Sequence, residues 1–175
     1  MQLARAPLLT FNTSYELHDM PTIDGLVSVL LNGRLSVHWI NWIVFTSSTV
    51  LVLFTGWKWR KLESRDGGAS LNLMFGSALA VTLLVSPHEF THDLTLMLLA
   101  VLLVIGSSQW ELESGWRLAL ISSIVILYTI PLYFMLTLHH ELCLLALVLG
   151  LFAVSTLGLA DAASRQELPI DSISG

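Results

Sequence analysis

Long apolar stretches recur along this chain, and they are the feature that most limits what it can fold into. Five of them follow residue 38, at residues 39–57, 71–86, 94–108, 116–136 and 142–160. Each is near the roughly 20 residues that a helix needs to cross about 30 Å of hydrocarbon. Lipid cannot hydrogen-bond backbone groups, so such segments cross it as helices. The sequence therefore predicts an all-α fold, a polytopic transmembrane helix bundle of about five spans.

Composition supports this class. Charged residues make up 12% of the chain, against about a quarter in soluble domains. Hydrophobic residues make up 54%. The formal net charge of −5 and the lack of a long basic run argue against nucleic-acid binding. The single cysteine, Cys143, has no partner for an internal disulfide and is expected to pack as a small hydrophobe.

The lysines and arginines predict an orientation. Six fall in the segments 58–70 and 109–117 and in the tail 161–175, and two fall in residues 1–38 and the remaining turns. Because cytoplasmic loops are richer in these residues, the amino terminus is expected outside and the carboxyl terminus in the cytoplasm. This orientation places every histidine on the outer side: His18, His38, His88, His92, His139 and His140.

The two ends of the chain carry further expectations. Residues 1–38 are predicted to form an extracytoplasmic segment with a short helix at 22–33, capped by Thr22 and ended at Asn32-Gly33. That helix could pack on the protein or lie in the membrane interface. Residues 161–175 are expected to be a flexible cytoplasmic tail. An outer amino terminus with no preceding span predicts that the chain is the carboxyl-terminal part of a longer protein.

A polar patch at residues 86–93 interrupts the apolar pattern. It reads Ser-Pro-His-Glu-Phe-Thr-His-Asp and lies between two apolar stretches, where ionisable groups are costly and usually functional. His88 and His92 would share one face of a helix and, with Asp93 or Glu89, could hold a metal ion. The patch could equally bind a polar or phosphorylated ligand. It could also be structural, with Pro87 beginning a helix that Glu89 stabilises at its first turn.

Three other residues on the outer side are candidates for substrate binding. Arg34 could hold a phosphate through two hydrogen bonds, or be a solvated loop arginine. His139 and His140 could face the same site, or belong to an ordinary polar turn. The sequence contains no Gly-x-Ser-x-Gly, Walker or Gly-x-Gly-x-x-Gly motif and no paired cysteines, so it predicts no cofactor.

Two short motifs resemble glycosyltransferase family 87, a group of multi-span membrane enzymes of the GT-C type. The first is Ser86-Pro87-His88-x-x-x-His92-Asp93-Leu94-Thr95-Leu96, which resembles a late loop of that family. The second, Met20-Pro21-Thr22-Ile23-Asp24-Gly25-Leu26, is similar to a family stretch that precedes a span. The resemblance covers residues 15–160 and omits the early spans and the first outer loop, where the family's catalytic carboxylate lies.

The resemblance implies a glycosyltransferase that moves a sugar, commonly mannose, from a polyprenyl phosphate to a lipid or glycan acceptor outside a bacterial plasma membrane. It assigns His88, His92 and Asp93, together with the segment Met20–Leu26, to the donor or acceptor pocket and leaves the catalytic residue unknown. Two other interpretations stay open. The chain could be a non-catalytic truncated or split subunit that packs against a partner, or a small metal-ion transporter, which ionisable residues within the spans would favour.

Overall fold

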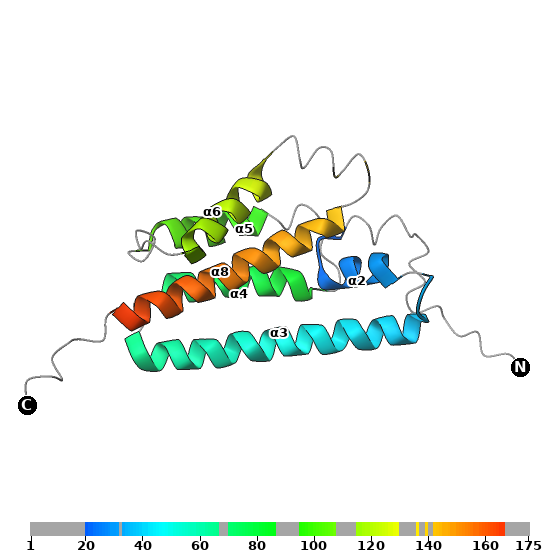
Figure 1. The fold of residues 1–175 in the computed structure, drawn as a ribbon, viewed down its shortest axis with the longest axis horizontal. Helices are drawn as coiled ribbons and strands as arrows, with labels where there is room; N and C mark the ends of the chain where they lie inside the picture. The colour runs from blue at the N-terminus through cyan, green and yellow to red at the C-terminus, as the bar shows by residue number, and fades with distance from the viewer. Residues whose placement is uncertain are drawn as a thin grey trace, which may run out of the picture.

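The computed structural model describes residues 20–31, 33–66, 70–86, 95–107, 115–129, 136, 139 and 142–166. All regular structure in these ranges is helical, as the sequence predicts, and Figure 1 shows the long helices lying side by side. In chain order the helices are α2 (Ile23–Leu31), α3 (Val37–Asp66), α4 (Leu71–Val85), α5 (Leu96–Ile105), α6 (Gly115–Tyr128), the 3-10 turn η3 (Leu142–Leu144) and α8 (Leu145–Gln166).

Two segments of helix are long and apolar enough to cross a membrane, judged by length and composition: Val37–Glu63 and Leu142–Arg165. The helices α4, α5 and α6 are apolar but have 15, 10 and 14 residues. At a helical rise of about 1.5 Å per residue, the described part of α5 is only about 15 Å long. The described residues therefore contain two candidate spans and three shorter apolar helices.

Helix boundaries match the sequence expectations in some places and differ in others. The expected span at 71–86 forms as α4, Leu71–Val85, with Ser86 as its C-cap. By contrast, α3 continues beyond Trp57 to Asp66, where a loop was expected, because lysine and arginine are good helix formers. Likewise α8 runs to Gln166, into the expected tail. An ion pair between Arg165 and Asp161 at 2.8 Å stabilises that last turn.

The short helix α2 forms as the capping signals predict. The backbone N–H of Gly25 donates to Thr22 Oγ1 at 3.1 Å, which satisfies one of the free amides of the first turn. The helix ends at Leu31, and Gly33 adopts a φ of +74°, a conformation that glycine reaches without steric cost. Ile23 and Leu26 pack against the main core, whereas Leu30 is exposed. The helix therefore rests on the protein along one side and faces outward along the other.

Helix α8 lies at the centre of the packing. It contacts α4, α6 and α3, and Leu149, Phe152 and Leu159 are fully buried along it. Trp116, at the start of α6, lies against Gly158, near the end of α8. In the same way Gly76, early in α4, lies against Val104, late in α5. Both pairs of helices therefore run antiparallel.

The remaining contacts complete an alternating arrangement. Trp59, late in α3, approaches Ser77, early in α4, so this pair is antiparallel as well. Lys58 and Asp161 join the late parts of α3 and α8, which run parallel. Successive long helices thus reverse direction, and the bundle has two distinct ends. We call them the His38 end, where α3 and α8 begin, and the Lys58 end, where their basic residues lie.

Candidate functional site

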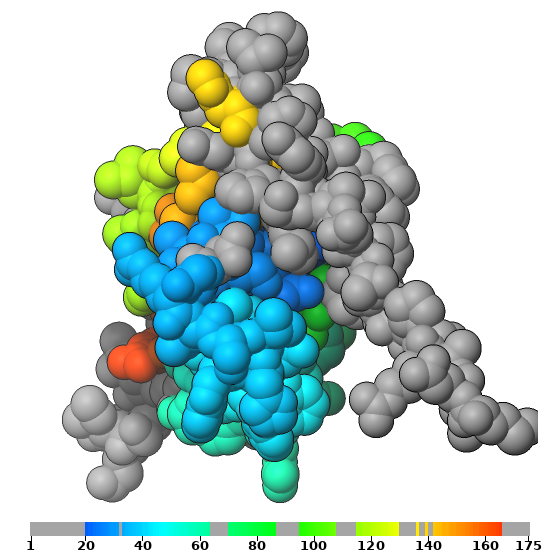
Figure 2. Space-filling model, turned by 90° about the vertical axis from the view of Figure 1, so that its right-hand side faces the viewer, coloured from blue at the N-terminus to red at the C-terminus, as the bar shows by residue number. Residues whose placement is uncertain are grey.

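Most of the predicted site residues fall outside the described ranges. His88, His92, Asp93 and His140 are among them, so their roles remain predictions. Arg34 and His139 are described, and both are exposed. Arg34 precedes α3 and His139 precedes η3, which places them at the His38 end. Figure 2 faces this end, with residues of α2 and the beginning of α3 in blue and cyan.

Arg34 occupies a tight turn between α2 and α3. Its backbone N–H donates to the Leu31 carbonyl at 3.0 Å, directly after the glycine in the left-handed conformation. The turn fixes the backbone and leaves the side chain exposed. An exposed guanidinium at this position could bind a phosphate through two hydrogen bonds. The exposure of Arg34 fits a solvated loop arginine equally well.

The first turns of α3 carry an aromatic ladder that sequence reasoning missed. The indole N–H of Trp42 donates to His38 Nε2 at 3.1 Å, which requires that nitrogen to be unprotonated. The two rings meet edge to face with their centres 6.3 Å apart, and Trp42 meets Phe45 in the same way. Because residues four apart share a helix face, the His-x-x-x-Trp spacing was the available signal. All three side chains are exposed.

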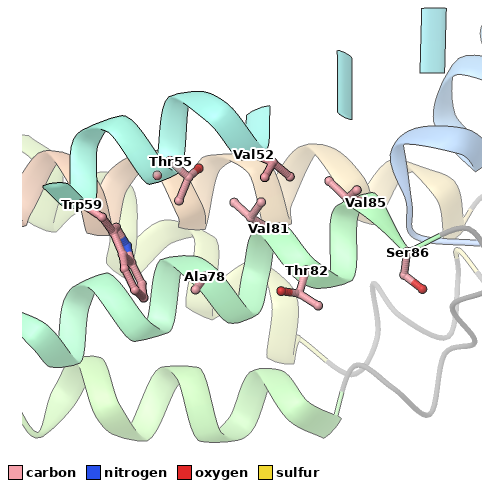
Figure 3. A pocket seen from close by; sticks show the side chains of 9 residues that line it. Val52, Thr55, Trp59, Ala78, Val81, Thr82, Val85 and Ser86 are labelled. Atoms are coloured by element: carbon pink, nitrogen blue, oxygen red, sulfur yellow. The ribbon is translucent and has the colours of Figure 1, made fainter. Parts of the chain in front are cut away.

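An apolar hollow lies between α3 and α4. It has a volume of ≈ 560 Å³ and is walled by small and β-branched residues, Val52, Thr55, Gly56, Ala78, Val81, Thr82 and Val85, with Trp59 and Ser86 at its ends. Figure 3 shows the α3 residues on one side and the α4 residues on the other, with the Trp59 indole directed toward α4. The Thr55 hydroxyl donates to the Leu51 carbonyl at 2.8 Å, so this wall presents mainly its methyl group.

A second hollow of ≈ 480 Å³ continues the first toward the His38 end. Both are lined by Val52 and Val85, and the second extends along α3 to Asn41. Asp24, from α2, lines this end and accepts a hydrogen bond from the Ser28 hydroxyl at 3.1 Å. The two hollows together form one groove, which we call the α3–α4 groove. It is mainly apolar along its length and polar at the end lined by Asp24 and Asn41.

The Lys58 end is built differently. Lys58 Nζ lies 4.0 Å from Asp161 Oδ2, which also pairs with Arg165. Lys58 Nζ and Lys61 Nζ lie 5.9 Å and 5.6 Å from the centre of the Trp57 ring. Both distances are within the range of cation–π attraction. These contacts hold a cationic surface around an exposed indole. They offer charge and aromatic area.

The described residues contain no group of three or more His, Cys, Asp or Glu side chains placed to hold a metal ion. The predicted alternative of a metal site at 86–93 lies outside those residues. Comparison with known protein families, with curated proteins and with solved structures finds no match to this chain. What the chain does must therefore be inferred from its sequence motifs and its geometry.

Proposed function

We propose that this chain is an integral membrane protein with five spans, its amino terminus outside and its carboxyl terminus in the cytoplasm. Helix α3 supports a membrane setting, because only 6% of its apolar window is buried inside the protein. A soluble protein rarely leaves such a long apolar surface in water. Exposed indoles bracket this surface at Trp39 and Trp57. These positions are roughly 27 Å apart along the helix, close to the thickness of a hydrocarbon core.

The sorting of charge between the two ends supports the orientation. Among the described side chains, the cationic ones at the Lys58 end are Lys58, Arg60, Lys61, Arg117 and Arg165. The His38 end has Arg34 with His38 and His139. An excess of lysine and arginine marks the cytoplasmic side. Because the helices alternate in direction, this sorting is the one expected from five crossings of one membrane.

We further propose that the chain corresponds to the carboxyl-terminal part of a membrane glycosyltransferase similar to family 87. The donor would be a polyprenyl-phosphate sugar, with mannose the expected sugar, and the acceptor a lipid or glycan. One observation carries this proposal. Asp24 lies in one motif and Val85 directly precedes the other, and both line the same hollow although they are far apart in sequence. The Met20–Leu26 motif therefore lies beside Val85, the residue that directly precedes the motif Ser86–Leu96.

The chemistry expected of the motif residues fits this reaction. Breaking a sugar–phosphate bond leaves negative charge on the phosphate, which an imidazolium or a guanidinium stabilises. His92 and Arg34 are of these types, and His139 and His140 lie on the same predicted side. A carboxylate such as Asp93 would accept hydrogen bonds from sugar or acceptor hydroxyls.

Cysteine labelling tests the topology. In a Cys143→Ala background, Arg34→Cys and Glu63→Cys each place one thiol at an exposed position near opposite ends of the bundle. A membrane-impermeant maleimide should label Arg34→Cys in intact cells, and Glu63→Cys only after permeabilisation. The reverse pattern would refute the orientation, and equal labelling of both in intact cells would refute the crossing of the membrane.

A transfer assay tests the activity. Membranes containing the chain, together with any spans encoded directly upstream, are supplied with radiolabelled polyprenyl-phosphate mannose. Loss of a charged hydrogen bond should make Asp93→Asn and His92→Ala about tenfold to a hundredfold slower in sugar transfer. Arg165→Ala, at the opposite end, serves as the matched control and should transfer normally. No transfer by the unmodified protein, or equal rates in all variants, would reject the glycosyltransferase.

A non-catalytic subunit is the second candidate, and one observation favours it. The surface of α3 that faces away from the bundle is apolar and broad, as a helix covered by partner spans would be. The transporter hypothesis has less support. The described helices α4 and α5 and residues 145–160 of α8 carry no ionisable acid, base or histidine, whereas ion pathways use such groups within the membrane.

A further inference from the structure

We infer that the α3–α4 groove holds one hydrocarbon chain of a membrane phospholipid whose headgroup carries an ammonium, namely phosphatidylethanolamine. The inference rests on the proposed placement of the chain in a membrane. It adds a lipid site whose polar end includes Asp24 of the Met20–Leu26 motif. Three features support it: the shape of the groove, the chemistry of its walls and the charge at its polar end.

The groove is long and open to the outside. From Asn41 to Trp59 it follows α3 for roughly 27 Å. Exposed side chains line its length, including Phe45, Val52 and Leu53. A hydrocarbon chain can therefore lie along it from the membrane side.

The walls are suited to hydrocarbon. Val52, Val81 and Val85 present methyl groups, and Gly56 and Ala78 leave the space between them open. The hydroxyls of Thr49 and Thr55 donate to backbone carbonyls of their own helix, at 2.7 Å and 2.8 Å. These donors are therefore already satisfied, and a chain of methylene groups can lie against the walls without leaving them unpaired.

The polar end selects the headgroup. Asp24 accepts one hydrogen bond from Ser28, and a carboxylate has room for about three more. The described residues that line either hollow include no lysine, arginine or histidine. Among these described residues, a phosphate would meet the negative charge of Asp24 and no cationic side chain. An ammonium would instead donate to Asp24 and bring an opposite charge to it.

Native mass spectrometry of the full chain in detergent tests the inference. The protein is titrated with phosphatidylethanolamine, phosphatidylglycerol and a polyprenyl phosphate, the two phospholipids having matched acyl chains. We expect one phosphatidylethanolamine per chain, bound about tenfold more tightly than phosphatidylglycerol. Asp24→Asn should abolish this preference while binding of a lipid chain remains.

Two variants obstruct the groove. Nothing lies within 4 Å of a Cβ built on Gly56, so Gly56→Leu fills open space and should lower lipid affinity at least about tenfold. Ala78→Leu does the same from the α4 wall. The matched control is Gly150→Leu on α8, which also meets nothing within 4 Å and lies away from the groove. All three replace small residues with a better or comparable helix former, which preserves the helices.

Several outcomes would overturn the inference: unchanged lipid binding in both groove variants, binding of polyprenyl phosphate that both groove variants weaken as much as they weaken binding of phosphatidylethanolamine, or a dimer that Gly56→Leu disrupts in place of a lipid. The measurement does not depend on sugar transfer. A chain that binds the lipid but transfers no sugar therefore refutes only the glycosyltransferase. A chain that fails the labelling experiment loses the membrane setting on which both proposals rest.

Discussion

Helices α3 and α8 are the longest among the described residues, and both are apolar enough to cross a membrane, yet they are packed in opposite ways. In α8, 61% of the apolar window is buried inside the protein, against 6% in α3. Among the described side chains of α3, three are buried: Ile40, Thr55 and Leu62. Helix α8 contacts helices on several sides, while α3 lies at the margin of the bundle (Figure 1).

Residue size explains the difference. The buried surface of α8 is rich in small side chains, including Ala153, Ser155, Thr156, Ala160 and Ala163. Small residues let neighbouring helices approach closely, and van der Waals packing drives helix association in a membrane. Helix α3 instead presents large apolar side chains outward, such as Trp39, Phe45 and Leu53. Both helices are therefore apolar, but only α8 has a surface of small side chains against which several helices pack.

The largest expected contrast comes from the same substitution made in both helices. Phe152 on α8 is fully buried, so Phe152→Ala leaves a cavity and should lower the free energy of unfolding by about 3 kcal/mol. The Phe45 side chain on α3 is exposed. Phe45→Ala should therefore change that free energy by only about 0.5 kcal/mol or less. Denaturant titration in mixed micelles measures both. Similar losses would show that α3 is packed against something in solution.

Glycine substitutions give an intermediate effect of opposite sign in the two helices. A Cβ on Gly158 of α8 would overlap the Trp116 ring, so Gly158→Ala should destabilise the protein by about 1–3 kcal/mol. On α3, Gly56→Ala meets nothing within 4 Å and should stabilise the helix by up to about 1 kcal/mol. Thermal unfolding followed by circular dichroism compares them. Trp116→Ala should relieve the Gly158→Ala defect if the indole is its cause.

The smallest effect concerns the ionic contact that joins the two helices. The side chains of Lys58 and Asp161 are 22% and 15% exposed, and their charged atoms lie 4.0 Å apart. A double-mutant cycle with Lys58→Ala and Asp161→Asn should give a coupling of about 0.2–1 kcal/mol that falls at high salt. Arg165→Ala removes only the pair within α8 and serves as the control. A coupling that salt leaves unchanged would show that the interaction is not mainly ionic.

Local signals allowed several elements to be predicted. The bounds of α4 at residues 71–85, the Thr22 cap of α2 and its stop near Gly33 all follow from chemistry between near neighbours in the chain. The continuation of α3 to Asp66 was missed because a run of charges was interpreted as a loop, although lysine and arginine form helices well. For the candidate site, the sequence predicted only which residues lie on the outer side of the membrane. The distance between Arg34 and His139 depends on how the helices pack.

The amino-acid sequence by itself determined that the chain is helical and apolar, where α2 and α4 begin and end, and which charges belong to which turns. These properties depend on hydropathy, caps and helix formers, which act over a few residues. Only the tertiary structure decided that α8 is central and α3 marginal, that Asp24 and Val85 line one hollow, and that a groove runs between α3 and α4. Those features depend on which small and large side chains meet between distant segments, and no local pattern records such pairings.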